Sequence, residues 1–521
     1  MNTQKQRDIL FGSIISGTDS LTLEQFNLQS DQLASGISKL GVKEGDVIAI
    51  FMRNRMQYLQ LIQACRSLGI YYCPINWHFT AQEVSFIVND SGAKLLFSER
   101  DLVSNILHKI SEDVPIICVN TITDLASDIQ NENSLATSRI IDFENWRTTH
   151  SYYAGTAVSP RGHMAYTSGT TGRPKGVVRF AVPLDKLQAQ QTFMQEVVIN
   201  ALGLQAGCRA LLPAPIYHSG PSIFTQVSLR VCEKFIVMPR FDPQEVLSLI
   251  EQHRINVVYL VPIMYVRLLK LPESIRNKYD LSSLNFVAST GSPCPPEVKR
   301  QMIEWFGPII YETYASSEAG MITGISSNEA LRKPGSAGKP IGKGVIKIYD
   351  DQGYLCAPNQ IGKIYVHQPA YADFTYKNNP EARKKIERNG LITLGDLGYL
   401  DEEGFLFVCD RESDMVISGG VNIYPAEIEN ELLTHPEIAD CGVIGVPDEE
   451  YGEKLIAFVQ PTESASKLHS NQLIEWLKQR IAGYKIPREF CFQLDLPRDD
   501  SGKIVKRKLR DPFWEKSARK V

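Results

Sequence analysis

Residues 166–177 read Tyr166-Thr-Ser-Gly-Thr-Thr-Gly-Arg-Pro-Lys-Gly-Val177 and continue a short apolar segment that begins at Met164. The glycines allow backbone N–H groups to approach an anion closely, the hydroxyl side chains can donate to phosphate oxygens, and Lys175 adds positive charge. The order Lys175-Gly176, with no Ser or Thr after the lysine, excludes a Walker loop. A flexible surface loop is the alternative, but so dense a set of phosphate-binding groups indicates a phosphate-binding loop.

The rest of the chain alternates between apolar runs and amphipathic segments. The apolar runs predict buried strands over residues 47–51, 94–97, 116–119, 257–261 and 284–289. Helices are predicted over residues 22–40, with a capping box from Thr22 to Gln25, and over residues 56–68 and 242–253. This alternation predicts an α/β fold with mostly parallel sheets.

The pattern changes near residue 340. Short strands and turns such as Asp351-Gln352-Gly353 predict a β-rich module over residues 342–408. After Arg411 the sequence predicts a compact α/β unit with helices over 425–435 and 471–482 and a strand over 438–446. We therefore expect a large N-terminal domain, residues 1–411, made of α/β subdomains plus the β-rich module. A small, mobile C-terminal α/β domain, residues 412–521, is expected to follow.

The composition excludes several function classes. Hydrophobic residues make up 43% and charged residues 22% of the chain, and the net charge is −4, which is typical of a globular protein that binds neither nucleic acid nor an anionic membrane. The sequence contains no run of about 18 apolar residues, so no membrane span is expected. The ten cysteines include no CxxC pair, so a zinc or iron–sulfur site is not expected. Scattered thiols and the absence of a signal-type N-terminus favour a cytoplasmic location.

The stretch from Tyr166 to Val177 closely resembles the signature loop of the adenylate-forming superfamily, which includes acyl-CoA synthetases, nonribosomal peptide adenylation domains and beetle luciferases. Further motifs of that superfamily follow in the expected order. The resemblance implies that the loop holds the β- and γ-phosphates of ATP and releases pyrophosphate. The residues that it assigns to this task are Thr167, Ser168, Gly169, Thr170, Thr171, Gly172 and Lys175.

The nucleotide-binding motifs lie between residues 290 and 411. In the superfamily the turn Gly291-Ser292-Pro293 covers one face of adenine, and Tyr314 stacks on the other face. The resemblance implies that Glu312 accepts from the adenine amine and that Thr313 belongs to the same segment. Ser317 takes the usual threonine position, and Glu318 is implied to bind Mg²⁺. Asp396 is implied to accept both ribose hydroxyls, and Arg411 to contact ribose or phosphate.

The acid is expected to bind beside the segment Pro213-Ala-Pro-Ile-Tyr217-His218-Ser219-Gly220. By resemblance, Tyr217, His218 and Ala315 line the substrate pocket, and His218 gates the access of the thiol as a catalytic residue. A histidine packed in a loop is the alternative reading of His218. Because alanine leaves the volume at position 315 open, the pocket is expected to prefer medium-to-long or aromatic acids over acetate.

The last motifs lie in the predicted C-terminal domain. Lys503, in Ser501-Gly502-Lys503, resembles the catalytic lysine that bridges the acid and the α-phosphate, and Gly419-Gly420 resembles the loop that lines the pantetheine tunnel. Ser413 stands at the hinge, where the superfamily usually has Asp or Lys. A basic run near the end is expected to be a solvated face, with coenzyme A phosphates or a carrier protein as the alternative ligand: Lys506, Arg507, Lys508 and Arg510.

Together these motifs imply an acid–thiol ligase that uses ATP, Mg²⁺ and coenzyme A. It activates a carboxylic acid to acyl-AMP with release of pyrophosphate and then forms acyl-CoA and AMP. The alternative acceptor is the phosphopantetheine thiol of an acyl carrier protein. A catalytically inactive nucleotide-binding scaffold is a remote alternative, because Lys503, Glu318 and the phosphate loop are all present. Several short strings resemble bacterial fatty-acyl or crotonobetaine/carnitine-type CoA ligases, among them Ile75-Asn-Trp-His-Phe79.

Overall fold

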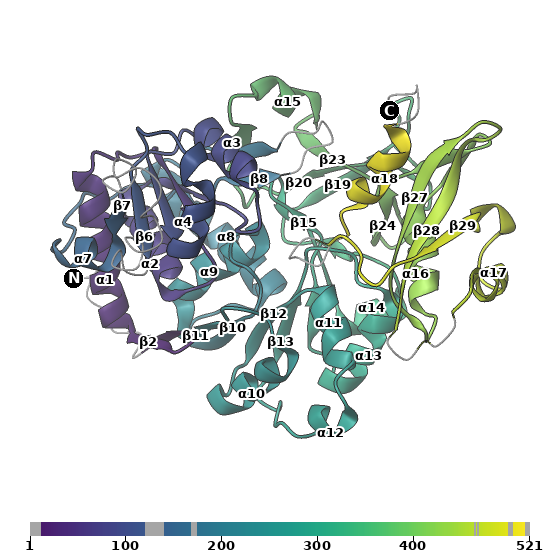
Figure 1. Cartoon of the computed structure of the whole chain (residues 1–521), viewed down its shortest axis with the longest axis horizontal. Helices are drawn as coiled ribbons and strands as arrows, with labels where there is room; N and C mark the ends of the chain where they lie inside the picture. Colours follow the sequence, from purple (N-terminus) through teal and green to yellow (C-terminus); the bar gives the residue numbers. More distant parts are fainter. Residues whose placement is uncertain are drawn as a thin grey trace.

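The computed structural model describes residues 12–119, 140–167, 174–462, 465, 468–498 and 504–515. Figure 1 shows the early strands and helices on one side of the molecule, the β-rich module next to them, and the last elements on the opposite side. Strands and helices alternate through the first three hundred or so residues, which confirms the predicted α/β class.

The largest sheet has nine strands, and its six central strands, from β14 to β1, run parallel. Its order is β18 (Lys339–Pro340), β17 (Thr323–Ser326), β14 (Ile310–Glu312), β13 (Phe286–Ser289), β12 (Val257–Leu260), β10 (Cys208–Leu212), β11 (Cys232–Val237), β1 (Ser13–Ser16) and β2 (Asp19–Thr22). Parallel neighbours need crossover connections, and helices supply most of them. One such helix is α10 (Pro243–His253), whose N-cap is Asp242, the first residue of the predicted range 242–253.

The second sheet is parallel throughout, in the order β4 (Tyr71–Pro74), β3 (Val47–Phe51), β5 (Leu95–Glu99), β6 (Ile116–Val119) and β7 (Ile140–Asp142). The largest hydrophobic core combines one face of this sheet with residues of the nine-stranded sheet, including Ile50 and Leu211. The helices of these subdomains are α1 (Leu23–Lys39), α2 (Met56–Leu68), α3 (Ala81–Ser91), α4 (Arg100–Ile106), α7 (Phe143–Thr148), α8 (Leu187–Leu202), α9 (Ser219–Val231), α11 (Pro262–Leu269), α12 (Glu273–Arg276), α13 (Pro296–Phe306) and α14 (Ser327–Arg332).

Two smaller sheets bring the phosphate-loop strands next to the β-rich module. Strand β9 (Lys175–Arg179) pairs on one side with β8 (Ala165–Thr167) and on the other with β21 (Phe374–Tyr376). The module itself is an antiparallel sheet of β19 (Val345–Tyr349), β20 (Gly362–His367), β23 (Leu391–Leu400), β22 (Glu387–Arg388) and β24 (Leu406–Arg411), with α15 (Pro380–Lys385) beside it. The predicted β-rich character of this region is confirmed.

The last unit is built on a long antiparallel hairpin, β27 (Ile438–Asp448) and β28 (Gly452–Pro461). The remaining elements of this unit are β25 (Val416–Ser418), β26 (Val421–Ile423), β29 (Glu489–Phe492), α16 (Pro425–Leu433), α17 (Ser470–Lys478) and α18 (Lys506–Trp514). Separate apolar clusters cover the two faces of the hairpin, one including Leu473 of α17 and the other Leu509 of α18.

One predicted helix boundary is wrong. Helix α17 ends at Lys478, four residues before the predicted end at Ala482. A short 3-10 turn at Gly483–Lys485 follows, and it leads the chain into strand β29. No helix among the described residues is long and apolar enough to cross a membrane.

Candidate active site

The two strands that flank the predicted phosphate loop lie beside Glu318, the predicted Mg²⁺ ligand. Thr167 ends β8 and pairs directly with Lys175, the first residue of β9. The Thr167 hydroxyl donates to Oε1 of Glu318 at 3.2 Å, and the Tyr376 hydroxyl donates to the same oxygen at 3.1 Å. The ammonium of Lys175 lies 5.4 Å from the ring centre of Tyr376. The structure therefore gathers two hydroxyls, an ammonium and a carboxylate beside the strands that flank the predicted loop.

Tyr376 is a member of this cluster that sequence reasoning missed. Burial raises the pKa of Tyr376, and the neighbouring Glu318 raises it further, so the phenol stays protonated and donates to the carboxylate. Its strand, β21, is linked to β9 only by sheet pairing, so no local motif marks it.

Six of the predicted site residues lie outside the described residues. They are the loop residues Ser168, Gly169, Thr170, Thr171 and Gly172 and the predicted catalytic Lys503.

The predicted adenine turn lies at the carboxyl ends of parallel strands β13 and β14, the edge where α/β sheets usually bind ligands. Gly291 has a backbone φ of +101°, a conformation that favours glycine. The Thr290 hydroxyl donates to the carbonyl of Thr313 at 2.7 Å, and the Thr313 N–H donates to the carbonyl of Ser289 at 2.8 Å. These bonds hold the Gly291-Ser292-Pro293 turn next to the Glu312–Tyr314 segment.

Glu312 has a partner that the sequence did not reveal. Its carboxylate lies 2.8 Å from the ammonium of Lys299 on α13, and both residues are buried. The pair brings two opposite charges out of water together, which costs less than burying either alone. Glu312, the predicted acceptor for the adenine amine, is thus already held in place by a buried lysine.

The predicted adenine and ribose residues form one polar cluster. The Tyr314 hydroxyl hydrogen-bonds to Oδ2 of Asp396, and Nε of Arg411 lies 3.6 Å from Oδ1 of the same carboxylate. Burial raises the pKa of Tyr314, and Asp396 raises it further, so the phenol donates. Asp396 lies in β23 and Arg411 ends the neighbouring strand β24, where the two residues are direct partners across the sheet.

The predicted wall of the acid pocket adjoins the same segment. Ser219 Oγ and Ser317 Oγ lie 2.7 Å apart, which ties the start of α9 to the residue before Glu318. His218 is the N-cap of α9, and its ring centre lies 4.5 Å from that of Tyr217. Ala315, in the two-residue strand β15 (Ala315–Ser316), is half-buried and pairs with Met321 of β16 (Gly320–Met321).

Ser413 lies in a turn between the β-rich module and the last unit. Met415 N–H donates to the carbonyl of Arg411 at 3.1 Å, and a side-chain nitrogen of Arg510 donates to the carbonyl of Ser413 at 2.8 Å. Lys363 of the module pairs with Glu412 at 2.8 Å. The turn is thus contacted from both sides, as a hinge between two bodies would be, and the domain boundary at 411/412 stays a prediction.

Gly419 and Gly420 form the turn between β25 and β26, where both have positive φ.

The predicted solvated basic face is wrong for Lys506. Its ammonium pairs with Glu429 at 2.9 Å, and only 16% of its side chain is exposed. Residues three apart share one face of a helix, so the packing of Leu509 on the hairpin carries Lys506 inward. Arg507 and Lys508 are exposed, as expected.

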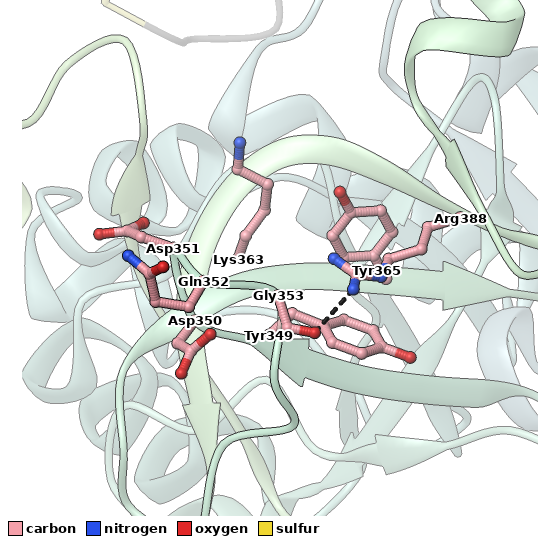
Figure 2. Close-up of a pocket in the computed structure, with 8 residues that line it drawn as sticks. All are labelled: Tyr349, Asp350, Asp351, Gln352, Gly353, Lys363, Tyr365 and Arg388. Carbon is pink, nitrogen blue, oxygen red and sulfur yellow. Dashed lines mark hydrogen bonds between the residues drawn. The ribbon is translucent and has the colours of Figure 1, made fainter.

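A separate surface hollow of about 270 Å³ lies on the β-rich module. Figure 2 shows Arg388 above the ring of Tyr349, with a hydrogen bond to the carbonyl of Gly353. None of the predicted site residues that the structure describes lines this hollow. The candidate active site is therefore defined by the converging motifs rather than by this hollow.

Comparison with known proteins agrees with the motif order and the fold. A family described as AMP-binding enzyme matches residues 2–373, and its C-terminal domain matches residues 427–503. The chain belongs to the AMP-binding enzyme family. It is similar to the 2-succinylbenzoate–CoA ligase of Bacillus licheniformis, with 32% identity over 503 residues, 95% of this chain and 96% of the relative.

Two further matches extend this result within the AMP-binding enzyme family. The fatty acid–[acyl-carrier-protein] ligase ScoC of Streptomyces coeruleorubidus is 30% identical over 513 residues, 96% of this chain and 93% of the relative. The o-succinylbenzoate CoA synthetase (MenE) of Bacillus subtilis, solved with the acyl-adenylate intermediate OSB-AMP, superposes with a TM-score of 0.79 at 28% identity, covering 99% of this chain and 98% of that one. The prediction of an ATP-dependent acid–thiol ligase in the acyl-CoA synthetase branch is confirmed.

Proposed function

We propose that this AMP-binding enzyme activates a medium-to-long or aromatic carboxylic acid at the site built around Glu318, Tyr314 and Asp396, with Mg²⁺ bound to ATP, and passes the acyl group to coenzyme A. The observation that carries the proposal is the convergence on Glu318 of hydroxyls from the phosphate-loop strand and from Tyr376. That contact supports a shared site for the predicted phosphate- and metal-binding groups, next to the predicted adenine and ribose groups.

A carboxylate flanked by hydroxyl groups fits a hard cation that completes its coordination with phosphate oxygens. When bound there, Mg²⁺ would neutralise charge on the phosphates. The protein's own part is to hold Glu318 with Thr167 and Tyr376, and to hold the nucleotide between the Gly291 turn and Tyr314. Both the acid and ATP are anions, so Lys175 and Lys503 supply the positive charge that their approach requires.

The acid pocket is proposed to lie between α9 and strand β15. Its walls would be Tyr217, His218 and Ala315, of which Ala315 is small and only half-buried. An open, largely apolar wall supports longer or aromatic acids, and the similarity to a 2-succinylbenzoate–CoA ligase favours an aromatic acid. His218, at the start of α9, is proposed to face both the acid and an entering thiol.

A carrier-protein thiol is the second candidate acceptor, because the fatty acid–[acyl-carrier-protein] ligase ScoC matches at 30% identity over nearly the whole chain. Coenzyme A is preferred because a 2-succinylbenzoate–CoA ligase matches at slightly higher identity. Either acceptor ends in the same phosphopantetheine thiol and would pass the turn at Gly419-Gly420. A cytoplasmic location, where both acceptors occur, is part of the proposal.

The test is an end-product assay with a panel of aromatic and aliphatic acids. The enzyme is incubated with ATP, Mg²⁺, one acid, and either coenzyme A or a phosphopantetheinylated carrier protein, and nucleotides are separated by chromatography. We expect AMP and pyrophosphate, together with a thioester of coenzyme A. Formation of ADP would contradict adenylation, and a thioester found only on the carrier protein would select the second acceptor.

A further inference from the structure

Arg179 ends strand β9, directly downstream of the predicted phosphate loop, and its guanidinium contacts the backbone at Ser317 and Glu318. One terminal nitrogen donates to the carbonyl of Ser317 at 2.7 Å and to the carbonyl of Glu318 at 2.9 Å. The other donates to the carbonyl of Ala372 at 2.8 Å. In the sequence, Arg179 is 138 residues from Ser317, 139 from Glu318 and 193 from Ala372. One side chain thus connects the exit of the phosphate loop to the backbone of the proposed metal ligand.

The guanidinium is also stacked. It lies 4.8 Å from the ring centre of Tyr371, within the range of a cation–π contact. Gly320 packs against the same ring, and a Cβ at that position would come within 2.3 Å of it. Gly320 has a φ of +76°, which favours glycine in any case. Tyr371 is therefore held between Arg179 and the turn that carries Glu318.

The charge of Arg179 is solvated by protein dipoles. Burial lowers the pKa of Arg179, and Tyr371, Glu318 and Asp373 oppose that shift. The guanidinium hydrogen bonds to Ser317, Glu318 and Ala372 all go to carbonyl oxygens, a geometry that suits a planar fork of five donors better than a single ammonium. A cation that is largely shielded from water is unfavourable unless these oxygens stay where they are, so it restricts the position of the Glu318 backbone.

We propose that Arg179 is a positioning residue that holds the backbone at Ser317–Glu318 against the phosphate-loop strand, and so sets the geometry in which Glu318 and the nucleotide share a Mg²⁺ ion. This inference rests on the proposed function of Glu318. It predicts that loss of the guanidinium weakens the use of the metal before it affects acyl transfer, because only adenylate formation involves the phosphates that the metal contacts.

The test compares Arg179→Met with wild type in two assays. The first measures AMP formation from acid and ATP as a function of Mg²⁺ concentration; the half-saturating Mg²⁺ concentration should rise at least about tenfold, since displacement of a positioned group by about 1 Å costs up to about a hundredfold in rate. The second supplies acyl-AMP and coenzyme A, and its rate should stay within about threefold of wild type. An unchanged Mg²⁺ dependence, or an equal loss in both assays, would overturn the inference.

Two variants keep the test decisive. Arg147→Met removes another buried guanidinium, which pairs with Glu144 on α7 away from the site, and it should lower the melting temperature without moving the Mg²⁺ dependence. Arg179→Lys keeps the charge and replaces R179M if that variant does not fold; it should still raise the half-saturating Mg²⁺ concentration, by about threefold. A wild-type Mg²⁺ dependence in R179K would count against the inference.

The same assay separates this inference from the proposed function. Glu318→Gln should raise the half-saturating Mg²⁺ concentration more than R179M does. If E318Q leaves it unchanged, the proposed metal site is wrong and the role of Arg179 falls with it. If E318Q changes it and R179M does not, the metal site stands and only the role of Arg179 is wrong. Isothermal titration of ATP with and without Mg²⁺ repeats the comparison without any acid.

Discussion

The hydroxyl of Tyr314 donates a hydrogen bond to the carboxylate of Asp396, although the two residues are 82 positions apart in the sequence. Arg411 lies beside the same carboxylate at 3.6 Å. The predicted adenine-stacking residue and the predicted ribose acceptor are thus parts of one cluster, in which the phenol holds the carboxylate.

This relationship gives a prediction for ATP binding. Asp396→Asn should raise the KM for ATP by about ten- to a hundredfold, because a hydrogen bond to a charged group contributes about 1.5–3 kcal/mol. Tyr314→Phe keeps the stacking ring and loses only the bond to Asp396, so its KM should rise less than about fivefold. Steady-state kinetics at saturating acid measure both values. A larger effect of Y314F than of D396N would show that the carboxylate does not bind ribose.

Much of the fold could be predicted because its signals are local. The capping box at the start of α1 is present in both directions, with Gln25 N–H donating to Thr22 at 3.2 Å and Thr22 N–H donating to Gln25 at 2.9 Å. The apolar runs over 47–51 and 116–119 form buried parallel strands as predicted. Each of these signals depends on residues within a few positions of one another, so a single sequence contains them in full.

Contacts between distant segments could not be predicted in this way. Nothing near Tyr376 in the sequence indicates that its hydroxyl meets Glu318, because their contact depends on the pairing of β21 with β9. Lys299 reads as an ordinary helix-surface lysine until α13 buries it on Glu312. The burial of Lys506 was missed for the same reason, since the hairpin against which α18 packs is distant in the sequence.

The first of the remaining predictions concerns Lys503, whose proposed role is confined to adenylate formation. Lys503→Ala should reduce AMP formation from ATP and acid by at least about a hundredfold, the scale of one lost charged contact in the transition state. Thioester formation from supplied acyl-AMP and coenzyme A should be largely kept. Comparable losses in the two half-reactions would show that the lysine acts throughout the cycle or only in folding.

A second prediction concerns the turn at Ser413. Ser413→Pro restricts φ but keeps the carbonyl that accepts from Arg510, so it tests rotation of the backbone rather than that contact. If the last unit turns about Ser413 between the half-reactions, one half-reaction should slow by at least about tenfold relative to the other. Ser413→Ala, which leaves the backbone free, is the control and should match wild type. Equal rates in S413P would place the hinge elsewhere.

A third prediction concerns the dependence of stability on pH. Burial, together with the smaller effect of the Arg179 charge, lowers the pKa of His163 from the 6.5 of an exposed histidine to about 3. Between these values the unfolded chain binds a proton that the folded chain does not, so His163 makes the folded state less stable as the pH falls from about 6.5 toward 3. His163→Gln should therefore flatten the fall of Tm over pH 6.5–4, measured by scanning calorimetry.

The control for this pH prediction is His108→Gln. His108 is exposed, so its removal should leave the slope of Tm against pH as in wild type. Because the neighbouring Gln226 lies 3.3 Å from Nδ1 of His163, H163Q is expected to lower Tm at pH 7 as well, and the slope is the informative quantity. A slope in H163Q as steep as that of wild type would show that His163 titrates normally in the folded protein.

The last prediction concerns the size of the acid and depends on Ala315. This residue follows the stacking Tyr314 and is half-buried in β15, next to the Ser219–Ser317 contact that joins α9 to the site. With a methyl side chain there, each added methylene of an aliphatic acid should gain about 0.8 kcal/mol on burial, or about fourfold in kcat/KM, until the pocket ends. Wild type should therefore barely use acetate.

Ala315→Trp should fill that volume, so it should suppress turnover of long and aromatic acids while AMP formation with the smallest acids is kept or gained. Ala315→Val, an intermediate step in size, should shorten the preferred chain by about one to two carbons rather than abolish the activity. The measurement is kcat/KM for AMP release across a series of acids from acetate upward. If wild type prefers acetate, or if the tryptophan variant keeps its long-acid activity, position 315 does not face the acid, and the pocket must lie on another side of α9.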